Sequence, residues 1–547
     1  MTKIIKLLLL AVLLYQCQLV AQINQISKPL SREQLKTWWH KDLDKDSIPG
    51  VSLEKAYKEI LANKIGQEII VAVVDTKLDI HHEDLKNQIW INSNEIPNNG
   101  IDDDKNGYVD DIHGWNYLGN TEGEEIVYSN YEVIRIIRKY KPLFEGKTLE
   151  EVAIADQEKF KLYQKALIQH TALVLRKTKE KNSWKEVADL YPKVQNDLAK
   201  FFPDKKYSIS KLDSLSKVYE KDNSLSYSLN YMKYCLLENI DVSFFEEQVT
   251  RIDQQLVTAV SLDYDDRNIT KDNPEDINDI GYGNPQVWND SIPFQHAILV
   301  SGILAADRSN NLGIKGVSDQ IKIMSLCVAS SGGDEHDKDM ALAIRYAVDH
   351  GAKVINMSFG KENSLHRNWV DQALKYAEQK DVVVVVSAGN EGEELNASYI
   401  HYPTNYDEQG NIFLNNFISV GASTHFNDKR LFSSFSNYSN KYVDIFAPGS
   451  EMYSTEHNNS YGFGDGTSYS APIVSGIAAL IRSHYPTLTA KQVKQIILDS
   501  GTSYEVEVSI KDADGSKKSV PFSELSKSGK IVNAYNALVL AEKMAKK

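Results

Sequence analysis

A serine stands where a helix would begin in the stretch Gly466-Thr467-Ser468-Tyr469-Ser470-Ala471-Pro472, which precedes an apolar run over residues 473–481. Proline is tolerated in a helix only near the first turn, so Pro472 places Ser468 at or beside a helix N-terminus. Free N–H groups and the helix dipole stabilise negative charge there, which suits a nucleophile. The same pattern fits a serine that only caps a core helix, and this stretch by itself favours the cap.

Two further residues have the chemistry to activate such a serine. Residues 69–74 are all apolar and end on Asp75, as in a buried parallel strand that delivers a carboxylate at its C-terminal edge. An N-cap for the following helix would look the same. His296 opens an apolar helical stretch over residues 297–306 and can act as a base, with Asp75 fixing its tautomer. We expect His336, which stands among charged residues, on a solvated face.

Residues 101–111 contain the spacing of a calcium-binding loop, with Gly107 at the sixth position counted from Asp102. The candidate ligands are Asp102, Asp104, Asn106, Tyr108 and Asp110. His113 replaces the glutamate that completes an EF-hand, so the loop would be a variant closed by Asp110 or Asp111. Because carboxylates this close repel one another, we expect structural Ca²⁺ here in preference to a solvated acidic turn. No organic cofactor is expected.

The segments that must position these residues alternate between strand and helix. Residues 321–328, 354–357 and 382–386 have the apolar pattern of buried strands, and residues 340–350 have that of a helix. Such alternation predicts an α/β fold, a doubly wound and mostly parallel sheet with helices on both faces. Catalytic groups of such sheets collect at the carboxyl ends of the strands, where Asp75 is expected.

A long segment differs from the rest in composition. The chain has 29 glycines, yet none lies between Gly146 and Gly281. The segment is rich in Lys, Glu, Leu and Tyr, with helical spacings such as Phe160, Tyr163 and Leu167. We therefore expect residues 121–262 to form a large α-helical insertion, which could bind a protein partner. A partner-binding coiled coil is less well supported, because no sustained heptad repeat can be traced.

Charge and the N-terminus bear on where the protein works. The net charge of −14 in 547 residues argues against nucleic-acid binding. Residues 1–21 have the basic start and short apolar run of a signal peptide, which predicts a secreted or periplasmic protein. Lipidation of Cys17, anchoring the protein at the cell surface or outer membrane, is the alternative, although small residues are lacking before it. Cys235 and Cys327 do not imply a disulfide framework.

Four blocks, in this order, resemble the subtilisin-like serine proteases, the subtilase family (peptidase S8). They are residues 71–75 with Asp84 and Leu85; His296 with residues 300–306; residues 387–390; and residues 466–468 with Ala471 and Pro472, the most specific block. The resemblance covers roughly residues 61–120 and 263–547, which would form the catalytic domain after an N-terminal arm over residues 22–60. It does not cover the helical insertion.

The resemblance implies a serine endopeptidase that cleaves proteins or peptides through an acyl-enzyme. Asp75, His296 and Ser468 would form the triad, and Asn390 would donate to the oxyanion. Two segments would pair with the substrate backbone: Ser330, Ser331 and Gly332, and Ser358, Phe359 and Gly360.

Two departures from the family pattern flank the triad. Lys77 stands where the family usually has glycine, and Ala-Ile-Leu at residues 297–299 replaces the usual Gly-Thr-His. Lys77 could add charge near Asp75, and Ala297 adds a methyl group where the backbone could need to pass closely. The alternative function is therefore a catalytically impaired relative that binds peptides or proteins.

Overall fold

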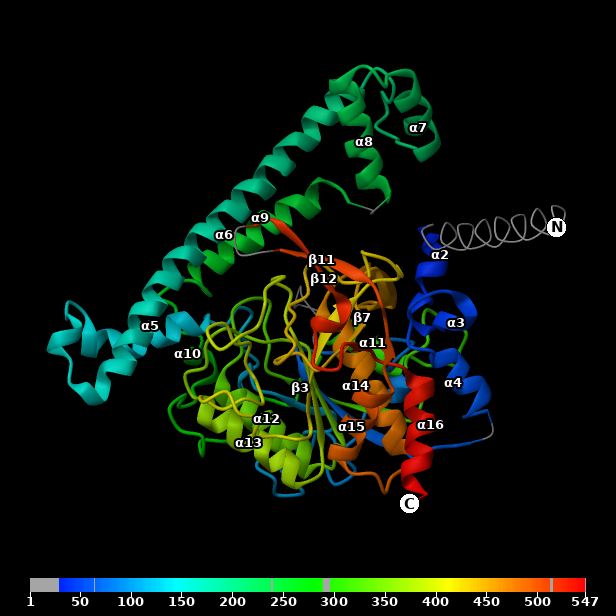
Figure 1. Cartoon of the computed structure of the whole chain (residues 1–547). Helices are drawn as coiled ribbons and strands as arrows, with labels where there is room; N and C mark the ends of the chain where they lie inside the picture. The colour runs from blue at the N-terminus through cyan, green and yellow to red at the C-terminus, as the bar shows by residue number, and fades with distance from the viewer. Residues whose placement is uncertain (1–28, 63, 238–239, 289–295, 512–514, 547) are drawn as a thin grey trace, which may run out of the picture. The chain divides into compact units, whose positions relative to one another are not determined.

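The computed structural model describes residues 29–62, 64–237, 240–288, 296–511 and 515–546. The expected signal peptide and Cys17 lie outside the described residues. The contacts within the chain separate two compact units, one made of residues 1–127 and 267–547 and the other of residues 128–266 (Figure 1). None of the helices in the described part of the chain combines the length and apolar character needed to cross a lipid bilayer.

A nine-stranded sheet in the order β10-β13-β7-β6-β5-β4-β1-β3-β2 forms the centre of the first unit. Its strands are β1 Ile69–Asp75, β2 Gly114–Asn116, β3 Ile321–Cys327, β4 Val354–Met357, β5 Val383–Ser387, β6 Phe417–Ser423, β7 Ile445–Pro448, β10 Thr502–Ser503 and β13 Lys530–Ile531. Neighbouring strands are parallel except β10 and β13. The chain leaves β1 for one side and later returns to its other side, so Asp75 lies at a topological switch point, where α/β sheets bind ligands.

Helices cover both faces of this sheet. Alternate side chains of β1 enter different cores, with Val71 and Val73 in one and Ala72 and Val74 in the other. The first core is completed by α11 (His296–Ala305), α14 (Thr467–His484), α15 (Ala490–Ser500) and α16 (Ala534–Ala545), and the second by α12 (Asp337–Asp349) and α13 (Arg367–Gln379). A strand buried on both faces must be apolar throughout. The predicted doubly wound α/β fold is confirmed.

The remaining elements of this unit are short. They are α2 Arg32–Leu35, α3 Leu43–Asp46, α4 Leu53–Glu59, α10 Arg267–Thr270, the hairpin of β8 Met452–Glu456 with β9 Ser460–Gly464, and the hairpin of β11 Glu507–Lys511 with β12 Lys517–Pro521. The segment before β1 is fixed to the first core by Trp38 and Trp39, which are buried.

The prediction that His336 faces solvent is wrong. His336 is buried at the start of α12, and its ring nitrogens lie 3.2 Å from Arg267 Nε. Charged residues from a distant segment compensate the charges beside it, since Arg267 pairs with Asp339 at 2.6 Å and Lys338 pairs with Asp272 at 2.8 Å. The charged residues around His336 therefore belong to a buried network of ion pairs. The local sequence could not predict this burial, because the partners lie in a distant segment.

All the regular secondary structure in the described residues of the second unit is helical. Its helices are α5 Glu132–Phe144, α6 Gln157–Leu198, α7 Ile209–Val218, α8 Asn223–Leu237 and α9 Val242–Val257. The long helices α6 and α9 lie side by side (Figure 1). An apolar cluster that includes Leu198, Phe202, Leu212 and Leu229 joins the end of α6 to α7 and α8.

Candidate active site

Asp75 and His296, 221 positions apart in the sequence, are joined by a hydrogen bond. His296 Nδ1 donates to the Asp75 carboxylate, with its two oxygens at 2.9 and 3.0 Å. Burial by itself lowers the pKa of His296, but the charge of Asp75 and this hydrogen bond outweigh it and raise the pKa above 6.5. With the proton held on Nδ1, the other ring nitrogen is the basic one.

The residue after Asp75 contacts both members of this pair. The backbone N–H of Thr76 donates to Asp75 Oδ1 at 2.7 Å. Its side-chain oxygen accepts from the backbone N–H groups of His296, at 2.7 Å, and of Ala297, at 2.9 Å. Because His296 is the first residue of α11, Thr76 satisfies N–H groups that a helix start leaves without an intrahelical partner.

Ser468 lies in the first turn of α14, at the helix N-terminus that the sequence predicts. The alternative of a capping serine is wrong, because Gly466 holds the N-cap position. Ser468 Oγ instead donates to the Ser358 carbonyl oxygen at 3.1 Å, and Ser358 Oγ donates to the Ser468 carbonyl at 3.2 Å. Gly449, after β7, lies close to the same helix start, since a Cβ atom there would lie 2.4 Å from Ser470 Oγ.

Asn390 follows β5 and faces the turn that carries Ser468. Its Oδ1 accepts from the Thr467 backbone N–H at 2.8 Å and from Thr467 Oγ1 at 2.9 Å. These two bonds orient the amide. Its Nδ2 group is consequently the end that can donate to a substrate oxygen.

The two segments predicted to bind substrate begin at the same edge of the sheet. Residues 358–360 follow β4, and Ser358 contacts Ser468 as described above. Phe359 packs against the core beneath α12 and α13, while Gly360 lies against the His401 ring, so closely that a Cβ atom would lie 2.0 Å from Cε1.

Residues 330–332 lie beyond β3, next to Asp75. The N–H groups of Val328 and Ala329 both donate to the Asp75 carbonyl oxygen, at 2.9 and 3.2 Å. Further along, the Ser331 N–H donates to the Val127 carbonyl at 2.9 Å, so a neighbouring segment already pairs with it. Ser330 Oγ donates to the Gly332 carbonyl at 2.6 Å.

The two departures from the family pattern each have a structural partner. Lys77 is buried and forms an ion pair with Glu125, whose side chain is only 9% exposed. The negative charge of Glu125 therefore offsets the positive charge of Lys77 and reduces its effect on Asp75. Ala297 is fully buried in the core shared with α14, where its methyl group packs among apolar side chains.

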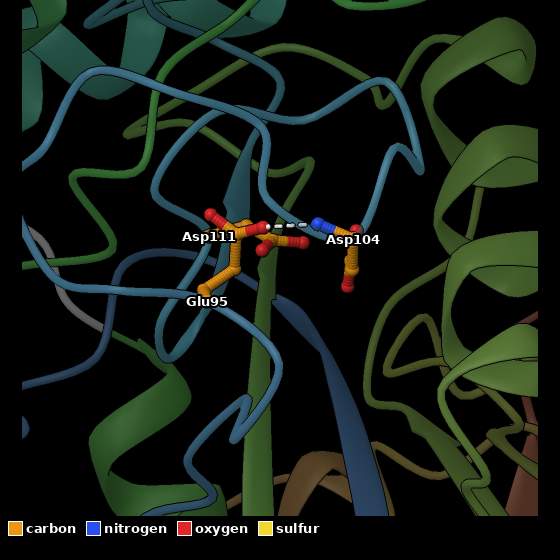
Figure 2. A group of neighbouring side chains, drawn as sticks. All are labelled: Glu95, Asp104 and Asp111. Atoms are coloured by element: carbon orange, nitrogen blue, oxygen red, sulfur yellow. Dashed lines mark hydrogen bonds between the residues drawn. The ribbon is translucent and has the colours of Figure 1, made fainter.

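Glu95, Asp104 and Asp111 converge near the predicted calcium loop, and Figure 2 shows these side chains gathered together. Each offers an oxygen, and these oxygens all lie within 4.8 Å of one another. Asp111 also accepts hydrogen bonds from Tyr346 and, at 2.9 Å, from Asn106. Burial raises the pKa of Glu95, and the charge of Asp111 adds to the effect. An all-oxygen, carboxylate-rich set matches what Ca²⁺ prefers.

Of the five ligands predicted from loop spacing, only Asp104 belongs to this group. Asp102 accepts from the N–H groups of residues 106 and 107, and Asp110 from those of residues 99 and 100, all at 2.9–3.0 Å. Asn106 accepts from the Tyr108 N–H at 2.7 Å, and the Tyr108 ring packs against aromatic neighbours. Glu95 was missed because it lies outside the loop at no fixed spacing.

The sequence matches the profile of the subtilase family over residues 66–519. The chain belongs to the subtilase family. It is 34% identical to subtilisin DY of Bacillus licheniformis, over 38% of this chain and 70% of that protein. It is 36% identical to thermitase of Thermoactinomyces vulgaris, over 40% of this chain and 73% of that protein. Membership of this subtilase family confirms the predicted enzyme class, a serine-type endopeptidase.

Two further similarities differ in how much of each chain they cover. The thermophilic serine proteinase of Bacillus sp. (strain AK1) is 38% identical over 34% of this chain, and the match spans 42% of the length of that proteinase. A solved structure of a protease from Pseudoalteromonas arctica is 25% identical, covers 45% of this chain and 70% of that one, and has a TM-score of 0.37.

Proposed function

We propose that this subtilase is a secreted endopeptidase in which Ser468 is the nucleophile, His296 the general base and Asp75 the residue that orients His296. The observation that carries the proposal is the hydrogen bond of 2.9 Å between His296 Nδ1 and Asp75 at the carboxyl edge of the sheet. The bond favours the tautomer in which Nε2 can accept a proton, as a triad requires.

The reaction follows from these groups. His296 Nε2 takes the Ser468 hydroxyl proton as Oγ forms a bond to the carbonyl carbon of the substrate, and the carbonyl oxygen becomes an oxyanion. As the C–N bond breaks, His296 gives this proton to the leaving amine, and an acyl-enzyme remains. Water then attacks the ester with the same base, releasing the acid and restoring Ser468.

Oxyanion stabilisation would come from two donors, Asn390 Nδ2 and the Ser468 backbone N–H. The contacts of Asn390 Oδ1 with Thr467 fix the amide and leave Nδ2 as the end that can donate to the oxyanion. Replacing one such donor typically lowers kcat by about 100- to 1000-fold. We therefore expect Asn390→Ala to lose kcat by this factor, with little change in KM.

Labelling with a fluorophosphonate tests the nucleophile. The folded protein should form one adduct on Ser468 and cleave a denatured protein substrate, whereas Ser468→Ala and His296→Ala should do neither. Ser398→Ala, an exposed serine outside the site, is the matched control and should behave as the wild type. A wild-type protein that stays folded yet gives no adduct would support the impaired peptide-binding relative instead.

We also propose that Glu95, Asp104 and Asp111 hold a structural Ca²⁺, which would neutralise three converging carboxylates. A cation that binds only the folded state stabilises it, so chelation should lower Tm. Asp111→Asn should abolish the Tm response to Ca²⁺, while Glu122→Gln, at an exposed acid outside the group, should preserve it. If Asp102→Asn abolishes the response and Asp111→Asn does not, the ligands follow the loop spacing instead.

Export and the role of the inserted unit complete the proposal. Residues 1–21 would be removed as a signal peptide, and N-terminal sequencing of the exported protein should begin close after residue 21. A lipid on Cys17 would appear instead as a mass increase on that residue.

The helical insertion would bind a protein partner or substrate, so deleting residues 128–266 should slow cleavage of folded proteins more than of short peptides.

A further inference from the structure

We infer that Thr76 is a positioning residue that sets the Asp75 carboxylate and the His296 imidazole relative to each other. The inference rests on the proposed triad and assigns a role to a side chain outside it. Thr76 is 3% exposed and lies between β1, which ends on Asp75, and the start of α11, which begins with His296.

The Thr76 hydroxyl uses its full hydrogen-bonding capacity in this place. A hydroxyl has two lone pairs and one proton. The lone pairs accept from the backbone N–H groups of His296 and Ala297, at 2.7 and 2.9 Å, and the proton is donated to the Lys77 carbonyl at 3.3 Å. Three partners in different directions fix the orientation of the side chain, so the oxygen is a rigid reference point for the helix start.

The same residue also holds the carboxylate. Its backbone N–H donates to Asp75 Oδ1 at 2.7 Å, the oxygen that also accepts from His296 Nδ1 at 2.9 Å. Thr76 thus fixes one partner of the Asp75–His296 bond through its backbone and the other through its side chain. A helix start is usually capped by the residue just before it, whereas here the hydroxyl comes from 220 positions away.

Loss of the Thr76 hydroxyl should therefore displace the His296 imidazole while leaving the protein folded. A misplacement of about 1 Å at a reacting group can cost about 100-fold in rate. Thr76→Val keeps the shape but removes the acceptor, and we expect kcat/KM to fall by about 10- to 100-fold, mainly through kcat. Thr76→Ser keeps the hydroxyl and should retain nearly all of the wild-type kcat/KM.

A pH profile separates positioning from general support. Asp75 raises the pKa of His296, so a weaker Asp75–His296 contact should lower that pKa. The acid limb of the pH profile of kcat/KM should then move to lower pH. Thr455→Val is the matched control, because Thr455 Oγ1 donates to the Ile298 carbonyl at 2.7 Å on the same helix. Thr455→Val should reduce stability but leave the acid limb in place.

Titration of His296 by NMR makes the test independent of turnover. Thr76→Val should shift the His296 titration to lower pH, and Thr76→Ser should restore it. An unmoved titration and unchanged kcat/KM in Thr76→Val would overturn the inference, and so would equal effects of Thr76→Val and Thr455→Val. If Thr76→Val does not fold, Thr76→Ala takes its place. An inactive wild type would refute the proposed triad, while the titration would still report on Thr76.

Discussion

The buried pair of Lys77 and Glu125 gives the sharpest prediction about stability. Their side chains are 4% and 9% exposed. Removing one partner of a buried ion pair leaves the other charge without compensation and typically costs about 3–5 kcal/mol of unfolding free energy. We therefore expect Lys77→Met and Glu125→Gln each to destabilise the protein by this amount. The double variant should cost far less than either single variant, because neither charge remains.

Urea unfolding followed by circular dichroism measures these differences. Lys271 and Glu122 form a matched control pair in the same part of the fold, with side chains 57% and 65% exposed. An exposed pair contributes about 0–1 kcal/mol, so Lys271→Met should change the midpoint little. If Lys77→Met were as mild as Lys271→Met, or if the double variant cost the sum of the single ones, the argument from burial would be refuted.

The same variants test whether Lys77 impairs catalysis. Glu125→Gln leaves the Lys77 charge uncompensated close to Asp75, where it would weaken the field that raises the pKa of His296. The acid limb of kcat/KM should then move to lower pH in Glu125→Gln and should return in the double variant. A wild type with low activity that rises in Lys77→Met would instead show that Lys77 itself inhibits the enzyme.

Buried titratable groups give three further predictions. Because His296 must be neutral to act as a base and its pKa is raised above 6.5, kcat/KM should fall as the pH drops through a value above 6.5, and Asp75→Asn should cost about 10⁴-fold in kcat. Burial raises the pKa of Glu335 from 4.5 to about 8, so the folded state loses stability as the pH rises across that window; Glu335→Gln should therefore raise Tm at pH about 9 and leave it unchanged at pH about 5. Burial also raises the pKa of Cys327 to about 12 and that of Cys235, so iodoacetamide should modify either thiol only after denaturation, as read by mass spectrometry.

The central strands β1, β3, β4 and β5 were predictable because they are buried on both faces. A strand such as residues 69–75 shows an unbroken apolar run that ends on a polar residue, and no long-range information is needed to recognise it. The start of α14 was predictable for a similar reason, since Pro472 restricts where a helix can begin. The placement of Asp75, His296 and Ser468 at element ends follows from these local rules together with the family resemblance.

The contacts that support the site were not predictable in the same way. Thr76 reaches α11 across 220 positions, and Lys77 reaches Glu125 across 48. Glu95 joins Asp104 and Asp111 from outside the loop. None of these pairs has a fixed spacing, so each could be found only after the fold had brought the segments together. For His336 the same lack of long-range information gave a wrong prediction. The charged residues next to it in the sequence suggested a solvent-exposed position, whereas contacts with a distant segment bury it.

The two departures beside the triad acquire a common explanation from these contacts. Without Glu125, the charge of Lys77, two residues after Asp75, would disturb the Asp75 carboxylate. Here the Glu125 carboxylate pairs with Lys77 and offsets that charge. The residues after His296 change the helix start, yet the N–H of Ala297 is bound by Thr76 and its methyl group packs in the core. Both departures are thus matched by partners within the same unit. Such compensation is expected where the geometry of the Asp75–His296 pair is retained, and it favours a working protease over a disabled relative.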